Sequence, residues 1–195
     1  MTAEGAPTEK AIRAFVAFPL AEEVRRDVAA TIRRLAPSLP DLRFVREEGA
    51  HVTLRFFGWT RAHTRAALEA PLRAAAAVCP PFDTAIRGLG LFPERGRPRV
   101  LWLGLALPAP AARLQAACET AAVAAGLEPE TRAFHPHLTL GRWRDRAPRP
   151  ALPDVDLGSA HVCELVLYRS DIRPSGSVYT PLAVFPLGGA AAAVG

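Results

Sequence analysis

Two copies of one short pattern hold the side chains best suited to chemistry in this sequence. His51 and Thr53 belong to "HVTL" (51–54), and His137 and Thr139 belong to "HLTL" (137–140), although the chain has only five histidines. Because the unperturbed pKa of histidine is ~6.5, one imidazole can donate a proton while the other accepts one. Threonine hydroxyls can donate hydrogen bonds to the non-bridging oxygens of a phosphate. The repeated pattern therefore predicts cleavage of a phosphoester without a metal.

Both patterns are expected to form β-strands, because only a strand keeps the histidine and the threonine on one face. Alternate side chains of a strand point the same way, so His51, Thr53 and Arg55 should share a face. The apolar residues between them, together with Phe56, should occupy the opposite face and pack on the core. The second copy repeats this arrangement. The histidines and threonines should therefore look outward.

The rest of the chain supplies the elements that must position these strands. Hydrophobic spacing, prolines and glycines predict strands at 11–20, 82–92, 99–107, 137–141, near 161–169 and at 178–186, helices at 21–36, 64–78 and 110–126, and a strand, a turn and a strand over 43–58. The second helix is expected to be interrupted or kinked at Pro71.

This order contains a rough duplication: strand, helix and motif strand occur twice. It predicts an α+β fold of two pseudo-symmetric lobes of antiparallel sheet with outer helices, and a central cleft between the motif strands.

Composition limits the class of protein. Half of the 195 residues are hydrophobic, enough for a core without disulfides, and the net charge of +5 supports a phosphate-bearing partner only weakly. Three widely spaced cysteines indicate reduced thiols and the cytoplasm, and no signal peptide or membrane span is evident. We expect a disordered N-terminus (1–10), one bilobal catalytic domain (11–187), a flexible tail (188–195) and a monomer.

The paired motifs resemble those of the 2H phosphoesterase superfamily, and within it the RNA 2′,3′-cyclic phosphodiesterases, also called 2′-5′ RNA ligases. The resemblance runs from about residue 11 to 187. The segments that carry it are "RAFVAFPL", "RFVREEGAHVTLRFFG", "PRVLWLGL", "FHPHLTLGR" and "ELVLYRSDIRPSGSVYTPLAVFPL".

This resemblance implies hydrolysis of a 2′,3′-cyclic phosphate, on an RNA end or a nucleoside, to a 2′-phosphate, with no cofactor. By motif position His51 would be the proton donor to the departing 3′ oxygen, and His137 would be the proton acceptor that activates water. Thr53 and Thr139 would hold the phosphate, and Arg142 would add positive charge.

Further candidates for substrate contact are Arg13, Phe15, Arg55 and His135, with Phe15 a candidate for stacking on a base. Three alternatives stay open. The reverse reaction would join RNA ends through a 2′-5′ bond with the same residues. A non-catalytic module would use the histidines only to grip an RNA end. A metal site could use His135 and His137, although Pro136 separates them and no third ligand has suitable spacing.

Overall fold

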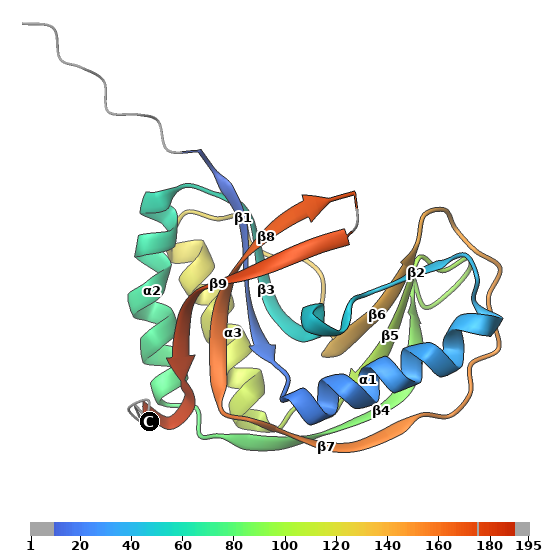
Figure 1. The fold of residues 1–195 in the computed structure, drawn as a ribbon. Helices are drawn as coiled ribbons and strands as arrows, with labels where there is room; N and C mark the ends of the chain where they lie inside the picture. The colour runs from blue at the N-terminus through green and yellow to red at the C-terminus, as the bar shows by residue number, and fades with distance from the viewer. Residues whose placement is uncertain (1–9, 175, 190–195) are drawn as a thin grey trace, which may run out of the picture.

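Two antiparallel sheets organise residues 10–174 and 176–189, which are the residues described by this computed structural model (Figure 1). Along the chain the elements are β1 (Ile12–Pro19), α1 (Glu22–Leu35), β2 (Leu42–Phe44), β3 (His51–Thr60), α2 (Ala62–Ala77), β4 (Phe82–Phe92), β5 (Val100–Leu105), α3 (Ala109–Ala124), β6 (His137–Trp143), β7 (Asp156–Val162), β8 (Glu164–Arg173) and β9 (Gly176–Pro186). Short 3₁₀ turns cover Ala36–Ser38 (η1), Glu47–Gly49 (η2) and Leu187–Gly189 (η3).

The strand orders confirm the two-lobed arrangement. The first sheet runs β3-β1-β8-β9 and the second runs β2-β6-β5-β4-β7. Each motif strand pairs with the strand that opens its half of the chain, since β3 lies beside β1 and β6 lies beside β5. The two halves also exchange strands, because β4 follows the first motif but joins the second sheet, and β8 joins the first. The sheets are therefore interlocked.

The helices cross over in the same way. α1 follows β1 but packs near β7 of the second sheet, whereas α3 follows β5 and packs against β3 of the first (Figure 1). α2 lies beside α3 and contacts β9. α1 packs through one apolar stripe, in which Val24, Val28 and Leu35 are buried, while both ends of the helix carry charged residues.

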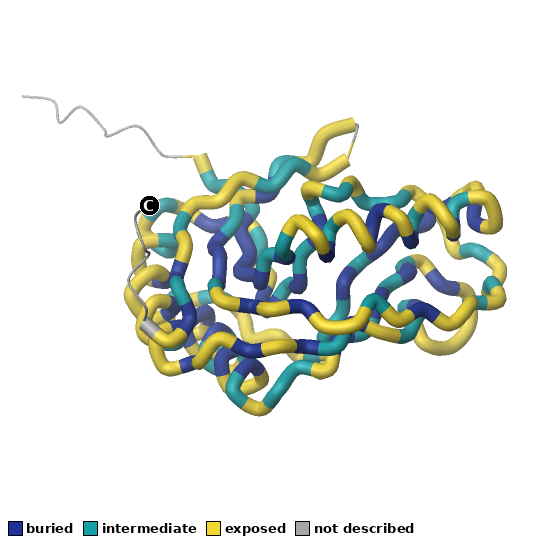
Figure 2. The backbone as a smooth tube through the Cα atoms, turned by 60° about the horizontal axis from the view of Figure 1, so that its bottom comes forward, coloured by how far each residue is buried: buried dark blue, intermediate teal, exposed yellow. Residues whose placement is uncertain are grey.

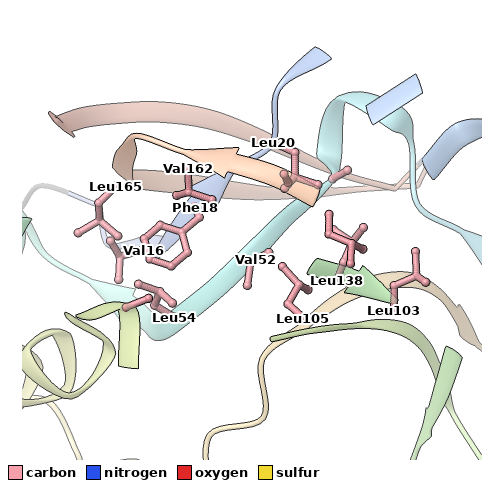
Figure 3. Close-up of a cluster of buried hydrophobic side chains, with 14 of the residues drawn as sticks. Val16, Phe18, Leu20, Val52, Leu54, Leu103, Leu105, Leu138, Val162 and Leu165 are labelled. Carbon is pink, nitrogen blue, oxygen red and sulfur yellow. The ribbon is translucent and has the colours of Figure 1, made fainter. Parts of the chain in front are cut away.

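One continuous core joins the two sheets. Val16 and Phe18 of β1 meet Leu103 of β5 and Leu138 of β6 in a single cluster (Figure 3). The buried segments in Figure 2 lie between the exposed helix faces and loops. Each such side chain contributes about 1.5–3 kcal/mol when fully buried, so the relative position of the lobes rests on this shared core. Because the core takes one face of each motif strand, the other face is left for histidine and threonine.

Two expectations from the sequence need correction. α2 continues through Pro71 without interruption, and the fully buried Leu68 and Leu72 anchor it on both sides of the proline. The strand expected near 161–169 is two strands that meet at Cys163. The strand, turn and strand expected over 43–58 are present as β2, η2 and β3, and β2 adds to the edge of β6.

The expected disordered N-terminus and flexible tail fall outside the described residues, apart from residues 10, 188 and 189. Among the described residues no helix is both long and apolar enough to cross a membrane.

Candidate active site

The two motif strands lie next to each other although they belong to different sheets. β3 is the edge strand of the first sheet. β6 is covered at its edge by the three residues of β2, which pair only with Gly141 to Trp143. The histidine end of β6 is therefore open on that side, and β3 packs against β6. The sequence expectation that the motif strands face each other is confirmed.

Each motif histidine is oriented by the same local hydrogen bond. The Nδ1–H of His51 donates to the carbonyl of Gly49 at 2.7 Å, and the Nδ1–H of His137 donates to the carbonyl of His135 at 2.7 Å. A carbonyl can only accept, so these bonds place the proton of the neutral ring on Nδ1 and leave Nε2 free to exchange a proton. Thr53 Oγ1 donates to Nε2 of His51 at 3.0 Å. Two histidines from separate halves of the chain thus present the same nitrogen.

Each motif strand also contains an extra residue, relative to its neighbour, within the motif itself. The pairing of β1 with β3 passes from Thr53 to Arg55, and the pairing of β5 with β6 passes from Thr139 to Gly141. The unpaired residue is the motif leucine in both cases. Such a bulge resets the alternation of side chains, so the residue three positions after the threonine returns to the histidine face. Those residues are Phe56 and Arg142.

The bulge overturns the expectation that Arg55 shares a face with His51. Arg55 is buried, forms an ion pair with Glu119 of α3, and donates hydrogen bonds to the backbone carbonyls of Phe56 and Glu128. It joins the motif strand to the helix behind it. Simple alternation put Phe56 in the core, but Phe56 is exposed instead.

Two of the basic candidates, Arg142 and Arg13, have side chains outside the core. Arg142 is exposed, and its charge lowers the pKa of both His51 and His137, so its guanidinium lies close enough to act on either ring. Arg13 is partly exposed and stacks over the ring of Phe56, with its guanidinium carbon 4.9 Å from the ring centroid.

Three aromatic rings lie near the imidazole of His51. The ring centroids of Phe15 and Tyr179 lie 4.7 and 4.8 Å from its imidazole, and Tyr168 stacks on Phe15 at 5.2 Å. Phe15 is only 1% exposed, so the expectation that it stacks on a substrate base is wrong. Its face is taken by the imidazole and the neighbouring tyrosine. The two tyrosines were missed from the sequence, because β8 and β9 carry no motif that links them to the histidines.

His137 has an aromatic environment of its own. Phe92 lies 5.0 Å from it with the rings edge to face, and Trp102 lies 6.3 Å away. His135 contacts both of these rings, at 5.4 and 4.8 Å. The imidazole of His135 therefore faces the aromatic side of the second sheet, while its carbonyl orients His137.

Burial controls the protonation of the two motif histidines. The pKa of His51 is lowered from 6.5 to about 4: loss of solvent is the largest cause, the Gly49 carbonyl opposes it, and the charges of His137 and Arg142 add to the lowering. Loss of solvent also lowers the pKa of His137, with the charges of His135 and Arg142 acting in the same direction. Both rings therefore favour the neutral form until an anion lies between them.

The described residues contain no group of three or more His, Cys, Asp or Glu side chains placed to hold a metal ion. His135 and His137 therefore have no third protein ligand of these types within the described ranges. The arrangement, two proton-exchanging nitrogens beside hydroxyls and a guanidinium, suits acid–base chemistry on a phosphate.

Comparison with known proteins gives the same picture. The family model described as "2′-5′ RNA ligase superfamily" matches residues 17–172. A protein of Methanothermobacter thermautotrophicus named "RNA 2′,3′-cyclic phosphodiesterase" is 35% identical over 183 residues, covering 90% of this chain and 99% of the relative. A protein of the same name from Thermus thermophilus is 33% identical over 196 residues, covering 91% of each chain.

The fold agrees as well. The crystal structure of E. coli LigT complexed with 3′-AMP superposes with a TM-score of 0.81 at 28% sequence identity, covering 91% of this chain and 99% of that one. A crystal structure of a Thermus thermophilus protein gives a TM-score of 0.80 at 30% identity, with 91% and 99% covered.

Proposed function

The chain belongs to the 2′-5′ RNA ligase superfamily, and on that premise we propose that it is an RNA 2′,3′-cyclic phosphodiesterase. It hydrolyses the cyclic phosphate at an RNA end, or on a nucleoside, to a 2′-phosphate. The observation that carries this proposal is the pair of histidines from two sheets, each with Nδ1–H bound to the carbonyl two residues earlier.

In the proposed reaction a water molecule attacks phosphorus opposite the 3′ oxygen. Nε2 of His137 accepts the proton of that water, and the protonated Nε2 of His51 gives its proton to the 3′ oxygen as the P–O3′ bond breaks. His51 ends neutral and His137 ends protonated, and exchange with solvent restores both. Thr53 and Thr139 donate hydrogen bonds to the non-bridging oxygens, and Arg142 balances the charge that develops there.

The substrate itself prepares His51 for its role. In the empty site the pKa of His51 is about 4, so its ring is neutral near pH 7. A phosphodiester carries one negative charge, and an opposite charge within a few ångström favours the protonated imidazole. Substrate binding therefore raises the pKa of His51 and favours the protonated ring that the reaction requires.

The reverse reaction, ligation through a 2′-5′ bond, would use the same residues by microscopic reversibility. Water is present at ~55 M as bulk solvent, so hydrolysis dominates unless two RNA ends are held together at a comparable effective molarity. We further propose that the protein acts as a monomer in the cytoplasm, where its cysteines would stay reduced.

The test is to identify the product by ³¹P NMR after incubation with a panel of nucleoside 2′,3′-cyclic phosphates and RNA ends. A new 2′-phosphomonoester resonance supports the proposal. Binding without that resonance would identify an RNA-end-binding module instead. The same reaction with EDTA should run at an unchanged rate, and inhibition reversed by one metal would favour the site at His135 and His137.

A further inference from the structure

The second sheet contains a pocket that the proposed reaction does not use. It has a volume of about 340 Å³ and is lined chiefly by Arg87, Trp102, Gly104, Ala106, His135 and Pro136. We propose that this pocket binds the nucleobase of the nucleotide whose cyclic phosphate is hydrolysed, and that the base stacks on Trp102. This inference rests on the proposed function.

The pocket lies on the catalytic side of the sheet. Trp102 on β5 pairs with Thr139 on β6, and directly paired residues of neighbouring strands project to the same face. Leu101 and Leu103 are fully buried and take the core face, which leaves Trp102 on the face of His137. The indole lies 6.3 Å from His137, ring centre to ring centre. A base over the indole would therefore be within one nucleotide of the phosphate.

The indole lies across the neighbouring strand because two glycines make room for it. Gly90 on β4 pairs with Trp102, and a Cβ atom at Gly90 would come within 2.0 Å of Cζ2 of the indole. A Cβ at Gly104 would lie 3.5 Å from Cζ3 and 2.9 Å from the carbonyl of Arg87. The ring thus fills the side-chain space of Gly90. Because Trp102 is only partly buried, part of its ring is left to a ligand.

The hydrogen bonding of the indole does not explain why residue 102 is a tryptophan and not a phenylalanine. Among the described residues, Nε1 of Trp102 has no hydrogen-bond partner although that atom is buried. A buried N–H without an acceptor destabilises the folded state, and phenylalanine would fill the same space without one. What the indole adds is a larger aromatic surface, which is the property that binds stacked bases.

The other residues that line the pocket can bind a nucleobase but do not distinguish among the four bases. The guanidinium of Arg87 and the imidazole of His135 can donate hydrogen bonds to the acceptor edges of a base. The lining residues include no carboxylate or amide side chain to read the opposite pattern. We therefore expect all four bases to be accepted, with stacking supplying most of the affinity.

The experiment compares adenosine 2′,3′-cyclic phosphate with ribose 2′,3′-cyclic phosphate, which lacks the base. Trp102→Leu should lower kcat/KM for the adenosine substrate about 5- to 150-fold, which is the roughly 1–3 kcal/mol of one stacked base converted to a ratio. It should leave kcat/KM for the ribose substrate within about twofold. For the adenosine substrate, kcat/KM of Trp102→Phe should lie between the values of Trp102→Leu and the wild type. The matched control is Trp59→Leu, which removes an exposed tryptophan outside the pocket and should change neither value.

An equal loss on both substrates would overturn the proposal, because it would show that Trp102 only supports the fold. No loss on either would place the base elsewhere. If Trp102→Leu does not fold, Gly90→Ala displaces the indole without deleting it and should give the same base-dependent loss.

A binding measurement keeps the inference separate from the reaction. In a Trp59→Phe protein, adenosine 2′-phosphate should quench tryptophan fluorescence, and ribose 2-phosphate should not. Quenching in a protein that hydrolyses neither substrate would refute the proposed function while supporting the pocket. An absence of quenching at saturating ligand would refute the pocket alone.

Discussion

The structure assigns Arg55 a role in stability and none in substrate binding, and this assignment can be tested by one substitution. We predict that Arg55→Met lowers stability and leaves substrate binding intact. The substitution removes the ion pair to Glu119 and two hydrogen bonds to backbone carbonyls, and it leaves the Glu119 carboxylate without its partner.

The magnitude follows from burial. Breaking a fully buried ion pair costs about 3–5 kcal/mol. Glu119 is 25% exposed, so water replaces part of the lost interaction, and about 3 kcal/mol is expected. For a domain of this size, 1 kcal/mol shifts Tm by about 2–4 °C, so Tm should fall by about 6–12 °C.

The assay is thermal and urea unfolding followed by circular dichroism, with KM measured at a temperature where the variant is folded. Glu119→Gln provides the control, because its amide oxygen can still accept from the backbone N–H of Glu130. The double variant Arg55→Met/Glu119→Gln should regain about 1–3 kcal/mol over Arg55→Met, since no unpaired charge remains. An unchanged Tm together with a tenfold rise in KM would refute the reasoning and make Arg55 a substrate contact.

Three further predictions concern the catalytic groups. Burial holds the pKa of both motif histidines below 6.5, and the reaction needs one of the two rings protonated. The value of kcat/KM should therefore fall about tenfold per pH unit between pH 7 and 8. A flat profile from pH 6.5 to 8 would contradict the assignment of the pair as acid and base. Thr53→Val and Thr139→Val should each lower kcat/KM about 10- to 150-fold, the value of a roughly 1.5–3 kcal/mol hydrogen bond to a charged group, and steady-state rates within twofold of the wild type would remove that threonine from the site. Arg142→Met should raise KM about tenfold and weaken the dependence of KM on salt. Arg113→Met, which removes an exposed arginine of α3, should do neither, and equal effects of the two substitutions would show that only the net charge matters.

The sequence predicted the features that depend on local periodicity. A histidine and a threonine two residues apart share a face in any regular strand, so His51 with Thr53 and His137 with Thr139 could be placed without coordinates. The strand–helix–strand order likewise predicted two lobes, because each half carries its own apolar pattern.

The features that were missed depend on partners distant in the chain. A bulge is defined by the register of the neighbouring strand, so nothing in "HVTLRFFG" itself places Arg55 inside and Phe56 outside. The exchange of β4 and β8 between sheets depends on the packing of the whole core. The role of Gly90 in making room for Trp102 becomes visible only when β4 and β5 are paired.

The central claim is that two imidazoles act as one unit on one phosphorus atom. The most direct measurement is kcat for His51→Ala, His137→Ala and the double variant, with a nucleoside 2′,3′-cyclic phosphate and with folding verified for each. Each single substitution should lower kcat about 10²- to 10⁴-fold. The double variant should be little slower than the less active single variant, because the effects of substituting groups that act in one step are not additive. Retained turnover in either folded single variant, or losses that multiply in the double variant, would contradict the account.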